Sequence, residues 1–196
     1  MTDMYYEENP TAAHDIHELK VTLLGTPMRF LTDAGVFSKK MVDYGSQVLL
    51  NTLDLESDKT LLDVGCGYGP LGLTLGKVLG IKPTLIDINR RALDLAEKNA
   101  KMNQVEAVIY QSNIYEKVEG NFDYIISNPP IRAGKAVVHE IIEGAFPHLV
   151  EQGRFTIVIQ KKQGAPSAKA KMEAVFGNCQ ILKKDKGYYI LESVKE

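Results

Sequence analysis

The hydrophobic positions of the chain fall into short apolar runs that alternate with amphipathic segments. Apolar runs typical of buried strands span 60–64, 83–88, 107–112, 122–127 and 154–160. Helical patterns, with apolar residues recurring every three or four positions, occupy 70–79, 90–103, 134–150 and 166–176. Strands that alternate with helices in this way predict an α/β protein with a doubly wound, mostly parallel sheet and right-handed crossovers.

The last two apolar runs, 179–184 and 187–194, depart from this alternation. The turn between them is too short to hold a crossover helix, so the two strands must be antiparallel neighbours. The pattern therefore predicts a seven-stranded sheet that ends in an antiparallel hairpin, unlike a dinucleotide-binding domain. In a doubly wound sheet the ligand lies at the carboxyl ends of the strands, near the point where the strand order reverses.

The beginning of the chain follows a different pattern. Residues 17–31 predict two short strands around a Gly25-Thr26-Pro27 turn. Residues 38–53 predict a helix with Ser38 as its N-cap. We therefore divide the chain into an N-terminal extension with a short β hairpin, residues 1–37, and an α/β domain, residues 38–196.

Composition narrows the class of protein. The chain has 196 residues, of which 44% are hydrophobic and 24% charged, with a net charge of −2, which are ordinary values for a globular protein. Its two cysteines form no CxxC pair, so we expect neither a disulfide framework nor a metal site. No apolar run is long enough to span a membrane, and the acidic N-terminus does not resemble a signal peptide. We expect a cytoplasmic protein without a membrane partner.

The small net charge hides an asymmetry along the chain. Residues 1–152 carry 14 Lys and Arg against 21 Asp and Glu, whereas residues 153–196 carry 9 against 4. A split of this kind is typical of a protein with one face that meets an anion. A solvated, lysine-rich surface without a ligand would give the same counts.

A glycine-rich segment, Asp63-Val64-Gly65-Cys66-Gly67-Tyr68-Gly69-Pro70, directly follows the first strand of the α/β pattern. Glycines at alternating positions allow a sharp turn and a close approach of the backbone to a ligand. The dinucleotide-binding GxGxxG pattern fails, because its third glycine would fall on Pro70. Asp87 ends the next strand, where a carboxylate can accept both hydroxyls of a ribose. A tight turn without a ligand and a solvated strand-end acid are the simpler alternatives.

A second motif, Asn128-Pro129-Pro130-Ile131, follows the apolar strand 122–127. Its two prolines fix φ and lack N–H donors, so the Asn128 side-chain oxygen and the Pro129 carbonyl remain as acceptors. Such a pair can hold both hydrogens of an NH₂ group and orient its nitrogen lone pair. The motif could also be only a rigid turn, but its place beside the glycine loop favours a functional role.

These motifs together resemble a known family. The glycine loop, Asp87 and the Asn128–Ile131 tetrad are similar to class I methyltransferases that use S-adenosylmethionine, which have a Rossmann-like fold. Within that class, the segment 32–38, TDAGVFS, followed by GSQVLL, resembles the RsmC-like group of methyltransferase small domains. That group methylates the 2-amino group of guanine in small-subunit ribosomal RNA. The resemblance covers about residues 30–194 and implies an enzyme whose partner is ribosomal RNA or the small ribosomal subunit. We expect the enzyme to be a monomer.

The resemblance also implies site residues. The catalytic residues would be Asn128, Pro129, Pro130 and Ile131. The cofactor would be bound by Gly35, Phe37, Ser38, Asp63, Gly65, Gly67, Gly69, Asp87, Ile88, Asn113 and Asn128. Many relatives have an aromatic residue in the place of Ile131, where it stacks on the target base. Stacking would therefore be weaker here or come from elsewhere, with Phe37 as a candidate.

The lysine-rich segment 160–171 follows the fifth strand and carries no acid. We expect its lysines, together with two cations after the tetrad, to contact RNA phosphates without reading sequence: Arg132, Lys135, Lys161, Lys162, Lys169 and Lys171. A target guanine would have to be unpaired or flipped out to reach the site. No His or Cys constellation indicates a general base, and we interpret His139 and Cys66 as packing residues.

Two other functions fit parts of the pattern. An acceptor pair such as Asn128 and Pro129 also suits methylation of a protein side-chain amide. A non-catalytic RNA-binding assembly factor could retain the same fold. The presence of Asp63, Gly65, Asp87 and Asn128 argues against the non-catalytic alternative.

Overall fold

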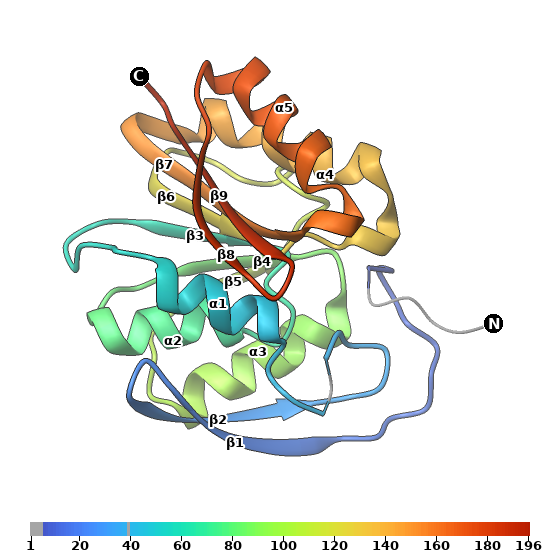
Figure 1. Cartoon of the computed structure of the whole chain (residues 1–196). Helices are drawn as coiled ribbons and strands as arrows, with labels where there is room; N and C mark the ends of the chain where they lie inside the picture. Colours follow the sequence, from blue (N-terminus) through green and yellow to red (C-terminus); the bar gives the residue numbers. More distant parts are fainter. Residues whose placement is uncertain (1–5, 39) are drawn as a thin grey trace.

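A seven-stranded sheet forms the centre of the computed structural model, which describes residues 6–38 and 40–196 (Figure 1). Its spatial order is β5 (Val108–Gln111), β4 (Thr84–Asp87), β3 (Leu61–Val64), β6 (Phe122–Ser127), β7 (Leu149–Gln160), β9 (Tyr188–Val194) and β8 (Gln180–Asp185). The strands from β5 to β7 are parallel, and β9 is antiparallel to both of its neighbours. The predicted mostly parallel sheet with a terminal antiparallel hairpin is confirmed.

Helices cover both faces of this sheet (Figure 1). One face carries α1 (Tyr44–Thr52), α2 (Pro70–Leu79) and α3 (Arg90–Met102), and the other carries α4 (Lys135–Ala145) and α5 (Ala165–Phe176). Along β6, Ile126 packs into the core on the α1–α3 side and Ile125 into the core on the α4–α5 side. Because both faces are buried, the central strands are continuous apolar runs. Among the described residues, no helix combines the length and apolar character that a membrane crossing requires.

The N-terminal extension adds a fourth layer. Strands β1 (His17–Leu23) and β2 (Thr26–Thr32) pair antiparallel, as predicted, and lie against the outer side of α3 (Figure 1). The Asn99 amide donates to the Leu31 carbonyl at 3.0 Å and accepts from the Leu31 N–H at 2.7 Å, and Asn103 makes the same pair with Arg29. Phe30 is fully buried in the core of the α1–α3 side. The extension therefore packs directly on the α/β domain.

Two of the predicted helix boundaries are wrong. Ser38 does not cap a helix: its φ is +55°, and its hydroxyl donates to the Met41 carbonyl. The helix begins at Tyr44, because the Asp43 side chain caps it by accepting from the Ser46 N–H at 3.2 Å. The predicted helix 134–150 ends at Ala145, followed by the short 3₁₀ turn η2 (Phe146–His148), after which the chain enters β7.

Candidate active site

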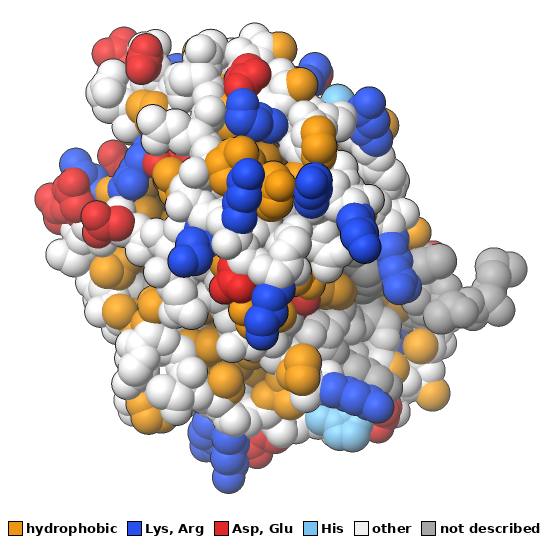
Figure 2. All heavy atoms as spheres, in the orientation of Figure 1, with side chains coloured by type: hydrophobic (Ala, Val, Ile, Leu, Met, Phe, Trp, Pro, Cys, Tyr) orange, Lys and Arg blue, Asp and Glu red, His pale blue; other side chains and the backbone are white. Residues whose placement is uncertain are grey.

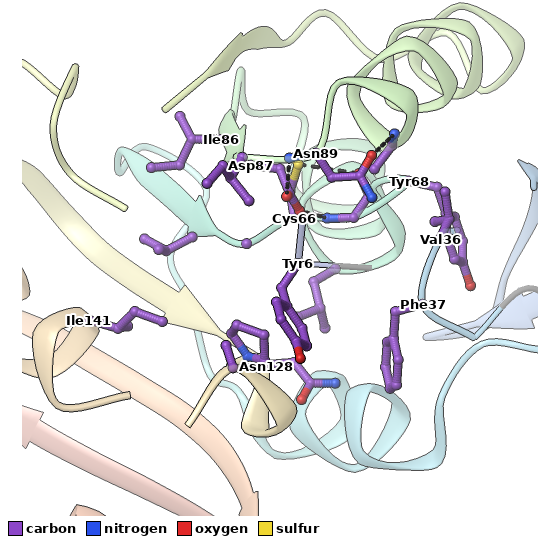
Figure 3. Close-up of a pocket in the computed structure, with 18 of the residues that line it drawn as sticks. Tyr6, Val36, Phe37, Cys66, Tyr68, Ile86, Asp87, Asn89, Asn128 and Ile141 are labelled. Atoms are coloured by element: carbon purple, nitrogen blue, oxygen red, sulfur yellow. Dashed lines mark hydrogen bonds between the residues drawn. The ribbon is translucent and has the colours of Figure 1, made fainter. Parts of the chain in front are cut away.

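The carboxyl ends of four parallel strands surround one cavity of about 280 Å³ (Figure 3). Residues that line it follow β3 at Gly65, β4 at Ile88, β5 at Ser112 and β6 at Asn128. This is the position that the doubly wound topology assigns to a ligand. Tyr6 and the segment Val36–Ser38 close the cavity from the N-terminal side.

The glycine loop opens its backbone to the cavity at two positions. Gly65 and Gly67 have φ of +72° and +57°, and a Cβ added at either position would meet no heavy atom within 4 Å. Gly69 has a different role, since a Cβ there would lie 2.6 Å from Leu73 Cδ1. The first two glycines therefore leave room for a ligand against the backbone, and Gly69 permits α2 to start close to the strand.

Asp87 is held at the end of β4 by backbone N–H groups. Its Oδ2 accepts from Gly67 N at 2.7 Å, and its Oδ1 accepts from Asn89 N at 2.9 Å. Burial raises the pKa of Asp87 to about 6, although these hydrogen bonds act in the opposite direction. The carboxylate lines the cavity and retains lone pairs that can accept hydroxyl groups.

Asp63 lies fully buried beneath the loop. Its Oδ2 accepts from Gly72 N at 2.9 Å, whereas its Oδ1 has no hydrogen-bond partner among the described residues. Burial, and then the neighbouring Asp87, raises the pKa of Asp63 to about 7. A buried acceptor without a partner is rare, and a cationic ligand group nearby would stabilise it. The open glycine backbone, the Asp87 carboxylate and this acceptor fit the amino-acid and ribose parts of S-adenosylmethionine.

Asn128 is oriented by two side chains of α1 and its cap. Its Nδ2 donates to Asp43 Oδ2 and to Ser46 Oγ, both at 3.0 Å. Both amide hydrogens are thereby used, and no donor in residues 6–38 or 40–196 contacts its Oδ1. Pro130, which lacks an N–H, lines the cavity beside it. This edge of the cavity therefore presents acceptors.

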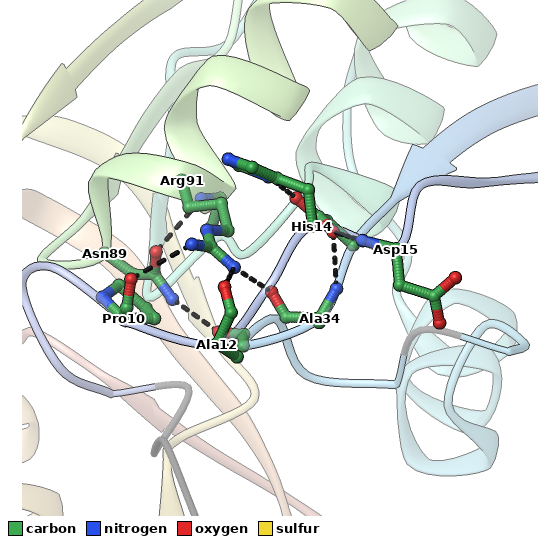
Figure 4. A network of polar contacts seen from close by, with 10 residues as sticks. Pro10, Ala12, His14, Asp15, Ala34, Asn89 and Arg91 are labelled. Atoms are coloured by element: carbon green, nitrogen blue, oxygen red, sulfur yellow. Dashed lines mark hydrogen bonds and ion pairs between the residues drawn. The ribbon is translucent and has the colours of Figure 1, made fainter.

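The N-terminal segment, residues 6–16, carries an aromatic side chain to the cavity. Tyr6 and Phe37 both lie on the side of the cavity that Asn128 occupies (Figure 3). The segment is fastened by Arg91 of α3, which donates to the carbonyls of Pro10, Ala12 and Ala34 at 2.7–3.0 Å (Figure 4).

Asp33, directly after β2, holds the same segment. Its carboxylate accepts from the Asp15 N–H and contacts His14 Nδ1, both at 2.5 Å, and accepts from the Ala34 N–H at 2.7 Å. Burial raises the pKa of Asp33, but these contacts outweigh it and hold the pKa below its usual value. The carboxylate that anchors the segment therefore stays ionised.

The structure brings most of the predicted site residues to the cavity, which is lined by Phe37, Ser38, Gly65, Gly67, Asp87, Ile88, Asn113, Asn128 and Pro130. Five predicted residues are not part of the lining, namely Gly35, Asp63, Gly69, Pro129 and Ile131. Ile131 packs against the core on the α4–α5 side. Gly35, with φ of +75°, lies against Pro10 and accepts from Asn89 Nδ2 through its carbonyl.

Sequence reasoning missed several residues of the lining. Asp43 and Asn89 cap α1 and α3, and both precede amphipathic runs as polar cap residues do, so the sequence offered a signal for them. Ser46 and Ser112 offered no such signal. Tyr6 lies far from every motif, and only the three-dimensional path of the N-terminal segment places it here.

The predicted RNA-contacting cations divide into two groups. Arg132, Lys135, Lys161 and Lys162 are exposed. Lys169 pairs with Glu173, and Lys171 with Glu143, so these two charges are partly neutralised.

Neither His139 nor Cys66 has the setting of a catalytic nucleophile or base. His139 contacts the Ser167 hydroxyl at 3.1 Å, between α4 and α5 and away from the cavity lining. Burial of Cys66 raises the pKa of its thiol well above its usual value. Within the described residues, no cluster of three or more His, Cys, Asp or Glu side chains could hold a metal ion.

The geometry is that of a methyltransferase site, and comparisons with known proteins agree. The methyltransferase small domain family matches residues 27–192. The chain belongs to this family. The uncharacterized protein YbxB of Bacillus subtilis (strain 168) is 44% identical to this methyltransferase over 200 residues, and the match covers both chains completely. Membership confirms the predicted family, fold and cofactor, S-adenosylmethionine.

Similarity to ribosomal RNA methyltransferases covers a larger share of this chain than of theirs. Ribosomal RNA small subunit methyltransferase C of Serratia proteamaculans (strain 568) is 34% identical over 175 residues, which are 87% of this chain and 47% of that protein. The structure of the T. thermophilus 16S rRNA N2 G1207 methyltransferase (RsmC) in complex with AdoMet and guanosine matches with a TM-score of 0.85 and 26% identity. That match covers 95% of this chain and 52% of that one. The chain thus spans about half the length of these relatives.

Proposed function

We propose that this methyltransferase transfers a methyl group to the exocyclic 2-amino group of a guanine in small-subunit ribosomal RNA, in the cytoplasm. The observation that carries the proposal is the orientation of Asn128, whose Nδ2 is bound to Asp43 and Ser46. Its Oδ1 remains as an acceptor at the cavity, where it suits an NH₂ donor. The similarity to an enzyme solved with AdoMet and guanosine supports guanine as the base.

The chain's own residues would position the reacting nitrogen. Asn128 Oδ1 and the Pro129 carbonyl accept its two hydrogens, which directs the lone pair toward the methyl group and stabilises the positive charge that develops on nitrogen. S-Adenosylmethionine supplies a methyl group on a sulfonium, which is already a good leaving group. The new N–C bond forms as the C–S bond breaks, the electron pair stays on sulfur, and the nitrogen then loses one proton to solvent. The main contribution of the protein is therefore to align the guanine nitrogen with the methyl group at near-attack distance.

Asp63, Asp87 and the glycine loop would hold the cofactor. Asp87 would accept the ribose hydroxyls, and Asp63 would face the cofactor's ammonium group. Ile88 would flank the adenine, and Asn113 would accept from the adenine amino group. Tyr6 and Phe37 line the Asn128 side of the cavity, so either ring can cover the face of the target base. This supplies the aromatic surface that Ile131 lacks.

Incubation with labelled S-adenosylmethionine tests the proposal. Substrates are naked 16S ribosomal RNA, small subunits and 70S ribosomes from cells that lack the gene, and the products are analysed by nucleoside mass spectrometry. We expect N2-methylguanosine in at least one assembly state. Ribonuclease-resistant label in protein would instead indicate side-chain amide methylation, and failure to bind S-adenosylhomocysteine would favour a non-catalytic assembly factor.

Asn128→Ala separates chemistry from cofactor binding in the same assay. We expect kcat to fall by about a hundredfold or more, because the nitrogen loses one of its two acceptors. The Kd for S-adenosylhomocysteine should change little. Equal loss of both would show that Asn128 has a structural role.

A further inference from the structure

A cluster of aromatic rings and lysines lies where the β8–β9 hairpin meets the start of α1. The rings of Tyr44 and Tyr188 are 5.7 Å apart, and Lys186 Nζ lies 4.9 Å from the centroid of Tyr44. Lys161 and Lys162 lie beside the hairpin tip, because Lys161 N donates to the Gly187 carbonyl at 2.9 Å. We call these five residues the hairpin-tip patch: Tyr44, Lys161, Lys162, Lys186 and Tyr188.

The patch has a defined geometry. Lys186 and Gly187 have φ of +47° and +82°, the pattern of a tight two-residue turn between paired residues Asp185 and Tyr188. Tyr188 packs directly on the first turn of α1, since a Cβ added at Gly45 would lie 2.7 Å from Tyr188 Cε1. The turn therefore holds Lys186 over the ring of Tyr44.

The patch adjoins the cavity. Asp43 and Ser46, which flank Tyr44 and Gly45 on α1, line the cavity and bind Asn128. Strand β7 leads to Lys161 parallel to β6, which leads to Asn128, so both emerge at the same edge of the sheet. One turn of α1 thus separates the Asn128 acceptor from the tyrosine pair.

The three lysines of the patch are not neutralised by neighbouring acids within the described residues. Lys161, Lys162 and Lys186 form no ion pair within the described residues, in contrast to Lys169 and Lys171. Asp185 is the one acid in the segment 180–188. Figure 2 shows Lys and Arg side chains spread over the surface formed by the hairpin and α5.

We infer that the hairpin-tip patch binds the RNA strand that flanks the target nucleotide. Lys161, Lys162 and Lys186 contact its phosphates, and a neighbouring unpaired base stacks on the Tyr44–Tyr188 pair. Aromatic side chains beside a cationic groove are the general means of binding single strands. The inference rests on the proposed action on RNA and locates the strand on this side of the cavity.

Binding of a fluorescent 12-nucleotide single-stranded RNA, measured by anisotropy across a salt series, tests the inference. The triple variant Lys161→Ala/Lys162→Ala/Lys186→Ala should lower the slope of log K against log salt by about 2. The double variant Lys98→Ala/Lys101→Ala, which removes two exposed lysines of α3, is the control and should leave the slope near that of the unmodified protein.

Stacking is tested separately with Tyr44. Tyr44→Leu should weaken RNA binding about tenfold, and Tyr44→Phe, which keeps the ring, should restore it. Unchanged affinity in the lysine triple variant, or equal affinity in the Leu and Phe variants, would overturn the inference. Because the readout is binding rather than methyl transfer, the result is independent of which group is methylated. RNA bound through the patch by a protein that makes no methylguanine would refute only the proposed function.

Discussion

At the scale of single residues, Asp43 connects the architecture of the domain to the proposed chemistry. One of its oxygens, Oδ2, accepts both from Ser46 N, as the cap of α1, and from Asn128 Nδ2. The start of a helix and the orientation of the acceptor amide therefore depend on one carboxylate. Ser46 adds a second contact to Asn128 through its hydroxyl. Asp43 and Ser46 are positioning residues, because they act through Asn128.

Asp43→Ser separates the two roles of Asp43. A serine caps a helix about as well as an aspartate, but its shorter side chain cannot reach Asn128. We expect kcat for RNA methylation to fall about ten- to a hundredfold, since a small misplacement of a positioning group has a large effect on the rate. The midpoint of urea unfolding should stay close to that of the unmodified protein. Ser46→Ala should lower kcat in the same direction, and an unaltered kcat in both variants would contradict the assignment.

At the scale of elements, the N-terminal segment, residues 6–16, lines one side of the cavity although it lies outside the α/β domain. Its anchor is the Arg91 guanidinium, which donates to carbonyls from both residues 10–12 and the loop after β2. Gly35 in that loop lies against Pro10, so the two stretches pack as one unit. Tyr6, at the beginning of this segment, lines the cavity.

Arg91→Gln should loosen the packing of residues 6–16 against α3, because it removes the hydrogen bonds of the guanidinium. Hydrogen bonds from a charged donor are stronger than neutral ones, and their loss leaves the carbonyls to water. We expect the Kd for S-adenosylhomocysteine, measured by calorimetry, to rise about tenfold, and limited proteolysis to cleave residues 6–16 sooner. Arg90→Gln is a matched control, because the exposed Arg90 side chain makes only a 3.8 Å ion pair with Glu8. Equal Kd values for the two variants would show that the segment does not contribute to the cofactor site.

The elements also show what could be predicted from the sequence. Apolar runs and the short 185–187 turn predict the mostly parallel sheet and its antiparallel hairpin correctly, because the burial of a strand and the length of a link are local properties of the sequence. The sequence predicts the start of this helix at Ser38, a residue type that caps helices, whereas in the structure the Ser38 hydroxyl donates to the Met41 carbonyl and Asp43 caps α1. The position of Tyr6 at the cavity and the Asp43–Asn128 hydrogen bond both bring together residues that are far apart in sequence. The spacing of apolar residues along the chain does not predict such contacts.

At the scale of the whole molecule, the two buried carboxylates of the site oppose the stability of the fold. The pKa of Asp63 is about 7 in the folded protein, against an ordinary value of 3.8, because burial disfavours its charge. The folded protein therefore retains a proton at Asp63 that the unfolded chain has already lost, and stability falls as pH rises from about 4 to 7. Above pH 7 Asp63 is ionised in the folded protein, and the full free-energy cost of burying its charge remains. A cationic ligand group would offset this cost.

Asp63→Asn should therefore make the ligand-free protein more stable and the cofactor site weaker. At pH 8 we expect the free energy of unfolding in urea to rise by about 1–2 kcal/mol, which is less than the pKa shift alone implies because the new amide nitrogen lacks an acceptor. At pH 5, where Asp63 is already protonated, the gain should disappear. The Kd for S-adenosylhomocysteine should rise in the variant at pH 8 and differ less at pH 5. A variant destabilised equally at both pH values, with unchanged cofactor affinity, would show that Asp63 serves packing alone.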